Sequence, residues 1–386
     1  MHACNNPLAR RPALLHRPVM TAKLTPLAAA LPATVPFTGP EALERRTGIP
    51  FRARLGANES LFGPSPRAIA AMAHAAAEVW MYGDPECHDL KDALAAHHGV
   101  SLANIVVGEG IDGLLGYLVR LIIAPGDAVV TSDGAYPTFN FHVTGFGGTL
   151  HKVAYRGNHE DPEGLIAMAR ASKAKLIYLT NPDNPMGSHH PAATVQVMLD
   201  ALPDGCLLAL DEAYIDLAPP GTAPAIAPDD PRMIRFRTFS KAHGLAGLRV
   251  GYAIAHCDLA NAFDRVRNHF GVGRVAQAGA LAALQDQPWL RQVQARVATA
   301  RVQVGQIAAA NGLTALPSAT NFVTIDCGQT DDFARNVLRE LGLRGVFVRM
   351  PGVPPLDRCI RISLGGEDAM DILAETLPSA LAAARG

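Results

Sequence analysis

The chain has 386 residues, of which 49% are hydrophobic and 18% charged, a balance that excludes a charge-driven disordered protein. Its 34 Lys and Arg residues face 35 Asp and Glu, for a formal net charge of −1. Because contact with nucleic-acid phosphates needs clustered cations, this balance argues against a nucleic-acid partner, and no apolar run reaches the ~18 residues of a membrane span. We therefore expect a two-domain soluble protein that acts on small molecules.

The N-terminal forty residues contain four Lys and Arg but no acid, which superficially resembles a targeting peptide. Prolines from Pro7 to Pro32 interrupt any amphipathic helix there, so we expect residues 1–34 to form a mobile arm, with Met20 as an alternative start. The six cysteines include no C-x-x-C pair, and no H-E-x-x-H motif occurs. These patterns favour reduced thiols, a cytoplasmic location and no metal site.

Short apolar strands alternate with helices through the first two thirds of the chain. Helices are expected at 66–77 and 89–98, the second ending at Gly99. The strands that follow are expected at 105–107, 128–131, 150–154, 176–179, 207–210, 233–236 and 250–254. Helices are expected between them and after them at 111–123, 138–144, 162–171, 192–202 and 259–269. This alternation predicts a mostly parallel sheet that is buried on both faces.

The pattern changes after Gly273, where two long helical stretches cover 275–285 and 289–310. Strands at 321–325, 346–349 and 359–363, with helices at 331–341 and 369–384, then predict an α+β unit. We expect a large domain at 66–275, a small C-terminal domain at 276–386, and a segment at 35–65 that joins the small domain.

Residues 108–113 read G-E-G-I-D-G, which matches the G-x-G-x-x-G turn of dinucleotide-binding proteins. The turn follows one expected strand and opens a helix, and Asp133 stands at the end of the next strand. Physically, the pattern indicates only backbone N–H groups exposed at a helix N-terminus, which suits any phosphate. A nicotinamide or flavin cofactor and a different cofactor phosphate therefore explain it equally well.

Three polar segments follow expected strands, at the edge where open α/β sheets bind ligands. They are N-P-D-N-P-M-G at 181–187, D-E-A-Y at 211–214 and T-F-S-K-A-H-G-L-A-G-L-R at 238–249. Taken singly, they have ordinary explanations: a turn, a helix N-cap and a solvated lysine. Their occurrence together, in this order and at strand ends, is much harder to explain by chance.

These segments resemble the fold-type I, pyridoxal-phosphate-dependent aminotransferases of class I and II, and are most similar to the histidinol-phosphate aminotransferase branch. The similarity runs from about Leu55 to Leu373 and is most specific in S-K-x-x-G-L-A-G-L-R-V-G from Ser240, in D-E-A-Y and in N-P-x-N-P-x-G. The resemblance implies an α/β fold with a three-layer, mostly parallel sheet and a smaller α+β domain. It also implies pyridoxal 5'-phosphate as the cofactor.

The chemistry of that cofactor requires a lysine amine and an acid beside the pyridinium nitrogen. The resemblance makes Lys241 the Schiff-base lysine and the base that moves the α-proton, and it pairs Asp211 with the pyridinium N1. Asn184 and Tyr214 would hydrogen-bond the phenolic oxygen of the ring. Tyr136, in G-A-Y-P, would stack on the ring face, although a core aromatic is the plain alternative.

The same resemblance accounts for the G-x-G-x-x-G turn. Backbone amides of Gly110, Ile111 and Asp112 would hold the cofactor phosphate, together with the Ser240 hydroxyl and the Arg249 guanidinium. The turn is then a phosphate site of the pyridoxal cofactor, and no dinucleotide is needed to explain it.

Four further residues bear on assembly and substrate. Tyr82 resembles the tyrosine that reaches the cofactor phosphate of the neighbouring subunit, which implies a homodimer with shared active sites. Arg361, on the apolar strand 359–363, would bind the substrate carboxylate or phosphate. Arg349 is a second candidate substrate arginine or a plain surface ion pair, and Asn58 would line the substrate entrance.

Four positions depart from the family pattern. Gly113 stands where an acid is usual, Met186 replaces a threonine, and His243 replaces an aromatic residue. Glu109 lies near the phosphate turn, where some histidinol-phosphate enzymes have arginine. These departures leave the catalytic groups in place but weaken the specific assignment of histidinol phosphate.

The expected function is transfer of an amino group from an amino acid, or a histidinol-phosphate-like amine, to a 2-oxo acid in a ping-pong cycle. A decarboxylase of a phosphorylated amino acid is an alternative with the same cofactor. A nicotinamide-dependent oxidoreductase that uses Gly108–Gly113 is an alternative from another class. A non-catalytic cofactor-binding regulator is disfavoured, since the expected elements include no N-terminal DNA-binding helices.

Overall fold

The structure is a computed structural model that describes residues 23–31 and 37–386. Most of the arm expected at 1–34 therefore lies outside the described residues, and the described part contains helix α1 (Pro26–Ala30). The expected alternation of strands and helices is present from residue 66 onward. Short 3-10 helices add η1 (Leu102–Asn104), η2 (Ile215–Leu217), η3 (Ala246–Leu248), η4 (Phe263–Arg265) and η5 (Leu356–Arg358).

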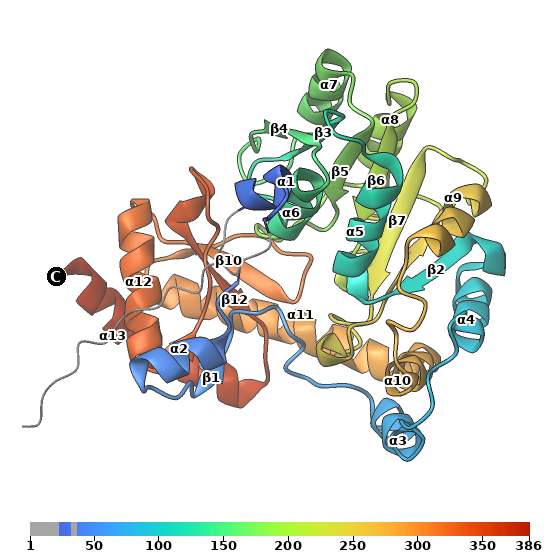
Figure 1. Cartoon of the computed structure of the whole chain (residues 1–386). Coiled ribbons are helices and arrows are strands. Elements are labelled where there is room, and N and C mark those ends of the chain that lie inside the picture. The colour runs from blue at the N-terminus through green and yellow to red at the C-terminus, as the bar shows by residue number, and fades with distance from the viewer. Residues whose placement is uncertain (1–22, 32–36) are drawn as a thin grey trace, which may run out of the picture.

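A seven-stranded sheet forms the centre of the large domain, with the strand order β2-β8-β7-β6-β5-β3-β4 (Figure 1). Only β8 runs antiparallel to its neighbours, while the other pairs are parallel, which confirms the expected mostly parallel sheet. The strands are β2 (Ile105–Gly108), β3 (Ala128–Ser132), β4 (Thr149–Val153), β5 (Leu176–Thr180), β6 (Leu207–Asp211), β7 (Met233–Thr238) and β8 (Gly251–Ile254).

Helices cover both faces of this sheet, so the large domain has three layers (Figure 1). The helices are α3 (Pro66–Ala76), α4 (His88–His98), α5 (Gly110–Ile122), α6 (Pro137–Gly145), α7 (Pro162–Ser172), α8 (Ala192–Asp200), α9 (Cys257–Ala262) and α10 (Arg274–Gln285). Successive residues of β5 show the alternation: Tyr178 packs with α5 and α6 on one face, while Ile177 and Leu179 pack with α7 and α8 on the other. The period-2 geometry of a strand thus explains why these strands are apolar throughout.

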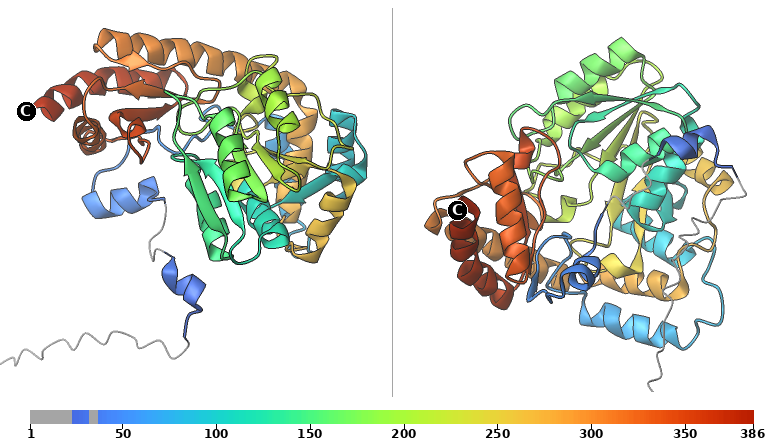
Figure 2. Two further views of the ribbon diagram at one scale, coloured as in Figure 1. Left: turned by 90° about the horizontal axis from the view of Figure 1, so that it is seen from above. Right: turned by 60° about the vertical axis from the view of Figure 1, so that its left-hand side comes forward.

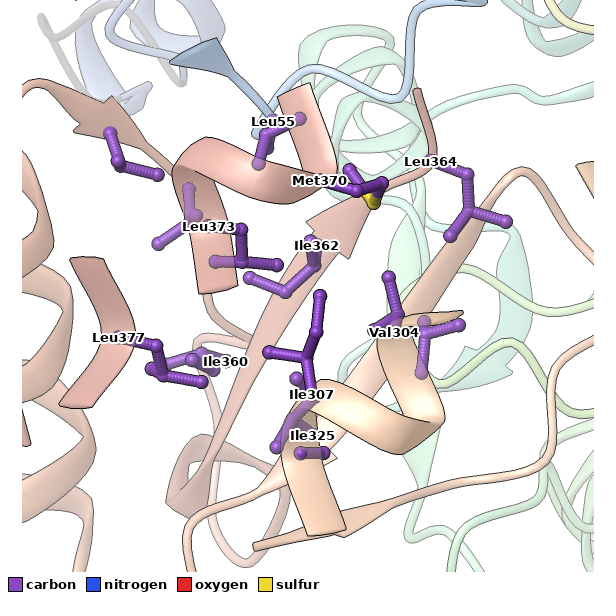
Figure 3. Close-up of a cluster of buried hydrophobic side chains, with 14 of the residues drawn as sticks. Leu55, Val304, Ile307, Ile325, Ile360, Ile362, Leu364, Met370, Leu373 and Leu377 are labelled. Atoms are coloured by element: carbon purple, nitrogen blue, oxygen red, sulfur yellow. The ribbon is translucent and has the colours of Figure 1, made fainter. Parts of the chain in front are cut away.

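The small domain combines four helices with two small sheets, β1-β11 and β12-β10-β9. Its elements are β1 (Ala53–Arg54), β9 (Thr314–Ala315), β10 (Phe322–Asp326), β11 (Val346–Phe347), β12 (Cys359–Ser363), α2 (Pro40–Thr47), α11 (Gln287–Ala310), α12 (Asp331–Leu343) and α13 (Glu367–Arg385). Strand β1 pairs with β11, so a segment from early in the chain completes this domain. Figure 3 shows its core, where Leu55 lies among Ile362, Met370 and Leu373.

The chain crosses between the domains at α10 and α11, and Figure 2 shows the small domain beside the large one. The expected boundary between residues 275 and 276 falls inside α10, whose buried residues pack with α3 and α4 of the large domain. The helix expected at 259–269 is shorter than expected: α9 ends at Ala262 and η4 at Arg265. Within the described residues, no helix has both the length and the apolarity needed to cross a membrane.

Candidate active site

A cavity of about 240 Å³ lies at the carboxyl ends of β5, β6 and β7. In a doubly wound sheet, loops at this edge diverge and leave room for a ligand. Nine of the residues singled out in the sequence line it: Ile111, Asp112, Tyr136, Asn184, Asp211, Tyr214, Ser240, Lys241 and Arg249. Its remaining lining residues are Ala57, Glu59, Thr180, Pro182, Ala213, Thr238 and Ala246.

One end of the cavity is built to receive an anion. Gly110 opens α5 with φ +75°, and a Cβ at this position would lie 2.6 Å from Nη2 of Arg249. The guanidinium of Arg249 also lies 3.4 Å from the Ser240 hydroxyl, through Nη1. The free N–H groups of a helix N-terminus, a hydroxyl and a guanidinium together form a phosphate-binding donor set.

Lys241 lies between this end and the small domain. Its Nζ donates a 3.0 Å hydrogen bond to the backbone oxygen of Asn58 and lies 5.5 Å from the centroid of the Tyr214 ring. Burial, followed by the positive charges of Arg361 and Arg249, lowers the pKa of Lys241 to about 8. A larger fraction of this amine is therefore neutral near physiological pH than of a solvated lysine, as a nucleophile or proton acceptor requires.

Asp211 forms the far end of the cavity, at the carboxyl end of β6. Its Oδ1 accepts a hydrogen bond from the Ala213 amide at 2.9 Å, and its Oδ2 accepts one from the Tyr178 hydroxyl at 2.7 Å. Burial raises the pKa of Asp211 to about 6, while the two hydrogen bonds oppose that rise. A buried carboxylate in this position can pair with a protonated ring nitrogen.

Asn58 connects the large domain to the small one at the cavity entrance. Its Nδ2 donates a 3.0 Å hydrogen bond to the Tyr214 hydroxyl, and its backbone N–H donates one of 2.9 Å to the Ser363 hydroxyl. Asn58 has φ 55°, a left-handed conformation that asparagine tolerates better than most residues. Its backbone oxygen also accepts a hydrogen bond from Asn321, so the position expected at the substrate entrance holds several site groups together.

Arg361 projects from β12 toward the same loop. Its Nη1 donates a hydrogen bond to Oδ1 of Asn184, and its Nη2 approaches the Gly56 oxygen at 3.4 Å. Its Nε is buried and has no hydrogen-bond partner among the described residues. Burial lowers the pKa of Arg361 to about 10, because a guanidinium removed from water is costly to keep charged. An anionic ligand would relieve that cost.

Arg349 stands beside Arg361 across an isolated antiparallel bridge. Its Nη2 donates a hydrogen bond to the Thr38 oxygen, and its guanidinium lies 5.1 Å from the Phe37 ring centroid. Phe37 in turn stacks on Tyr136, with ring centroids 6.0 Å apart. The alternative reading of Arg349, a surface ion pair, is not found in the described part of the chain, and its side chain contacts the N-terminal segment instead.

Tyr82 lies outside the cavity of its own chain and is 79% exposed. It packs against Phe270, with ring centroids 4.8 Å apart, and Trp80 beside it is 80% exposed. These large exposed aromatic rings form a surface patch with Val79 and Phe270. In one chain alone, Tyr82 therefore makes no contact with the cofactor end of the site.

Several polar groups at the site were not anticipated from the sequence. Tyr178 and Asn321 bond to site residues but lie in or beside apolar strands, where they look like ordinary core residues. Glu59 lines the cavity. Its position directly after Asn58, a predicted site residue, is the one feature of the sequence that could have identified it. Elsewhere, one possible group of metal ligands among the described residues, at 256–258, lies outside the cavity lining.

The departure at Gly113 is compensated locally. A Cβ at Gly113 would lie 3.5 Å from Oε2 of Glu109, so a carboxylate reaches this place from the preceding turn. The Tyr117 hydroxyl donates to Glu109 and accepts a 3.0 Å hydrogen bond from the Asn268 amide. The acid therefore anchors the loop before α10 instead of adding charge to the phosphate end.

The polar side chains of the cavity match the polar groups of pyridoxal phosphate. The phosphate group fits between the start of α5, Ser240 and Arg249, and the ring nitrogen fits at Asp211. Lys241 and Tyr136 line the same cavity. The arrangement can bind an aldehyde cofactor covalently and leaves Arg361 at the entrance for an anionic substrate.

Comparisons with known proteins agree with this geometry. Residues 53–377 match the family described as aminotransferase class I and II. The chain is 35% identical to histidinol-phosphate aminotransferase 2 of Carboxydothermus hydrogenoformans over 86% of this chain and 91% of that protein. A histidinol-phosphate aminotransferase from Sinorhizobium meliloti, solved with pyridoxal-5'-phosphate, is 52% identical over 94% of this chain and 99% of that one, with a TM-score of 0.91.

A more distant structure shows the fold alone. Aspartate aminotransferase from Thermus thermophilus, solved with maleate, has a TM-score of 0.78 at 22% identity, over 93% of this chain and all of that one. The alternatives of a nicotinamide-dependent oxidoreductase and of a decarboxylase find no support in these relatives. Of the turn at 108–113, Ile111 and Asp112 line the cavity.

Proposed function

The chain belongs to the class I and II aminotransferase family, and on that premise we propose that it transfers the amino group of a phosphorylated amine to a 2-oxo acid. It is a pyridoxal-phosphate-dependent transaminase. The proposed donor is L-histidinol phosphate, which the names of the curated relatives suggest. Among donors, an ordinary amino acid is the second candidate, because the entrance arginines suit a carboxylate as well as a phosphate.

The observation that carries the substrate proposal is the pair of guanidinium groups beside the cavity, where Arg361 bonds to the lining residue Asn184. Arg361 on β12 and Arg349, two residues after the end of β11, form an isolated backbone bridge with each other. Burial lowers the pKa of both side chains, so each is held charged at a cost. Two such cations side by side are stable when an anion binds between or beside them, and both partners of the reaction are anionic.

We assign the remaining roles by position. Bound pyridoxal phosphate supplies an electron sink for the bonds at the α-carbon. Lys241 would bind the cofactor and then, freed by the donor amine, accept and return the α-proton through its Nζ. Asp211 would keep the ring nitrogen protonated, while Asn184 and Tyr214 would bind the ring hydroxyl. Tyr136 would pack on the ring face.

A half-reaction tests the donor. Each amine is added to the holoenzyme without an acceptor, and the visible absorption of the bound cofactor is followed as it converts to its amine form. We expect the second-order rate constant for conversion of the cofactor to be higher with L-histidinol phosphate than with histidine, glutamate or phenylalanine. A higher rate with an unphosphorylated amino acid would overturn the phosphorylated donor and leave transamination intact.

We also propose that the enzyme is a homodimer with shared active sites. The support is the exposed patch around Tyr82, where aromatic and aliphatic side chains of 51–80% exposure stand together on the large domain. Such patches on a soluble protein commonly mark protein–protein contacts. In the proposed dimer, Tyr82 would extend into the phosphate end of the partner's cavity. Sedimentation or light scattering of the holoenzyme that gave only a monomer would exclude it.

A further inference from the structure

Tyr178 forms a hydrogen bond with Asp211, the acid proposed to face the cofactor, but does not itself line the cavity. It lies in the middle of β5, fully buried. Its hydroxyl donates the 2.7 Å hydrogen bond to Oδ2 of Asp211, and its ring stacks on Phe139 of α6, with centroids 4.3 Å apart and planes 15° from parallel. The ring packs like a core aromatic, but the hydroxyl is committed to one carboxylate oxygen.

The pairing of the strands sets this contact. Tyr178 is opposite Ala209 in the parallel β5–β6 pair, so its side chain and that of Asp211, two residues further along β6, lie on the same face of the sheet. A tyrosine is long enough to bring its hydroxyl to that carboxylate. Asp211 also lines the cavity, as Lys241 does.

The Tyr178 hydroxyl is important because a buried carboxylate such as that of Asp211 is costly to keep charged. Removing Asp211 from water favours its neutral form, and that burial is the largest influence on its pKa. Hydrogen bonds from Tyr178 and from the Ala213 amide favour the charged form instead. A hydrogen bond to a charged group is stronger than one between neutral groups, so loss of the hydroxyl would shift the balance toward the neutral carboxyl.

We propose that Tyr178 is a positioning residue, whose hydroxyl keeps Asp211 anionic and aims its carboxylate at the pyridinium nitrogen of the cofactor. The proposal rests on the role of Asp211 proposed above. An anionic, correctly aimed Asp211 keeps the ring nitrogen protonated, and the protonated ring is the stronger electron sink. Tyr178 would therefore act on the rate of the chemical step and on cofactor affinity, not on substrate binding.

The test is Tyr178→Phe in the holoenzyme, because this change keeps the stacked ring and removes only the hydroxyl. We expect the half-reaction rate constant to fall about 10-fold to 100-fold, with the apparent dissociation constant of the donor unchanged. Cofactor affinity, measured by the release of pyridoxal phosphate, should fall about 10-fold. The visible band titrates with the Schiff-base nitrogen that joins Lys241 to the cofactor. Its apparent pKa should rise, because a ring nitrogen that is less protonated repels a proton on the Schiff base less.

A matched control comes from Tyr155, which is partly buried and donates a 2.9 Å hydrogen bond to Oδ1 of Asp183. Tyr155→Phe also removes one hydroxyl from one buried carboxylate, but that carboxylate does not line the cavity. Both variants should lose thermal stability. Only Tyr178→Phe should change the pH titration of the visible band.

The outcomes separate this proposal from the one it rests on. If Tyr178→Phe loses stability like Tyr155→Phe but keeps the wild-type titration and half-reaction rate, Tyr178 is a structural residue and the proposal is wrong. Asp211→Asn, assayed alongside, is expected to be impaired more than Tyr178→Phe. If Asp211→Asn keeps the wild-type rate, the role of Asp211 fails and the inference about Tyr178 fails with it.

Should Tyr178→Phe not fold, 3-fluorotyrosine at position 178 gives an independent measurement. Its hydroxyl is more acidic and is a stronger donor to the Asp211 carboxylate, while the ring still packs on Phe139. We then expect the apparent pKa of the visible band to fall below that of the unmodified enzyme. An unchanged titration would contradict the proposal.

Discussion

The pKa of Lys241 depends on side chains from both domains. After burial, the largest influence that lowers it is the charge of Arg361 from the small domain, followed by Arg249 from the large one. The neutral amine is the form that can attack an aldehyde. The rate at which the apoenzyme binds pyridoxal phosphate should therefore rise with pH, with a midpoint close to the pKa of about 8.

Arg361→Gln should move that midpoint upward, because it removes a positive charge that disfavours the ammonium form. We expect a shift of about 0.5 to 1 pH unit in the rate of cofactor binding, measured by stopped-flow absorbance. Arg349→Gln is the matched control: Arg349 forms a backbone bridge with Arg361, but it is not among the largest influences on the pKa of Lys241. Equal midpoints in the two variants would show that Arg361 does not set the reactivity of Lys241.

At the scale of single residues, the sequence identified the groups that have a distinctive motif and missed those that do not. Asn184, Asp211 and Lys241 stand in short polar segments after strands, and all three line the cavity. Tyr178 stands inside the apolar run L-I-Y-L-T, where every residue is buried and nothing distinguishes a hydroxyl that bonds across strands. Its role depends on which strand lies beside β5, and strand order is not visible in the local sequence.

The start of α5 illustrates how an element supports the site. Gly110 has φ +75°, and a methyl group there would meet the Arg249 guanidinium at 2.6 Å. Gly110→Ala should therefore both strain the backbone and displace Arg249 from the phosphate end. We expect about a 10-fold to 100-fold loss of pyridoxal phosphate affinity, measured by fluorescence titration of the apoenzyme.

Gly113→Ala in the same helix is the control for that experiment. Gly113 has an ordinary helical conformation, and its Cβ would meet only Glu109 at van der Waals distance. Alanine is the better helix former, so stability should be unchanged or slightly higher. Similar losses of affinity in the two variants would mean that any side chain in this turn is harmful and that the contact with Arg249 is not special.

The loop that carries Asn184 is held by a buried pair of acids. Glu160 accepts hydrogen bonds from the Ser132 hydroxyl and from the Thr180 amide, and its Oε1 also lies within hydrogen-bond distance of the Thr180 hydroxyl oxygen. Asp183 accepts from the Thr180 hydroxyl at 3.0 Å and from the Met186 amide at 2.9 Å. Burial, followed by the charge of Asp183, raises the pKa of Glu160 to about 8. The pair therefore holds a proton at neutral pH.

This proton predicts a pH dependence of stability. The folded enzyme retains a proton on Glu160 that the unfolded chain releases, so stability is greatest below the normal glutamate pKa and falls as pH rises through about 8. Glu160→Gln keeps the neutral form at every pH. Between pH 6 and pH 9, the melting temperature of the wild type should therefore fall further than that of the variant.

Glu163 on α7 provides the control for that measurement. Its side chain is 83% exposed and pairs with Arg156 at the surface. Glu163→Gln should leave the pH profile of the melting temperature parallel to that of the wild type. A Glu160→Gln profile that is also parallel would contradict the presence of a retained proton on the buried pair.

At the scale of elements, regular periodicity was informative and loops were not. Helices and strands with several apolar positions lie close to where they were expected. The helix expected at 259–269 failed because its second half is instead a 3-10 turn followed by an irregular loop, in which Asn268 bonds to Tyr117. The strand expected at 346–349 is paired regularly only at Val346 and Phe347, since Arg349 makes a single bridge to Arg361. In both places a tertiary contact overrides the local pattern.

At the scale of the whole molecule, the cavity needs both domains. The large domain supplies the phosphate end, Lys241 and Asp211, while β12 supplies Arg361 and the N-terminal segment supplies Asn58. These groups are hundreds of positions apart in the sequence: Asn58 and Ser363 bond although 305 residues separate them. Motifs predicted the individual members, but the contacts between domains follow from packing that no local pattern encodes.

Complementation between two inactive variants tests whether the site extends to a second subunit. Lys241→Ala and Tyr82→Ala should each be impaired alone. In the second variant, the cavity of the partner subunit would bind the cofactor phosphate more weakly. If Tyr82 serves the partner, a mixed dimer has one doubly defective site and one wild-type site. Random reassociation of equal amounts after mild denaturation should then restore about a quarter of the wild-type activity.

The control is a mixture of Lys241→Ala with Asp211→Ala, whose side chains line the same cavity of one chain. In every mixed dimer of that pair each site keeps one defect, so no activity should return. If the mixture of Lys241→Ala with Tyr82→Ala also recovers nothing, Tyr82 acts within its own subunit or not at all. Recovery in the first mixture alone would place the exposed Tyr82 ring in the partner's active site, because no single chain contains a complete site in that case.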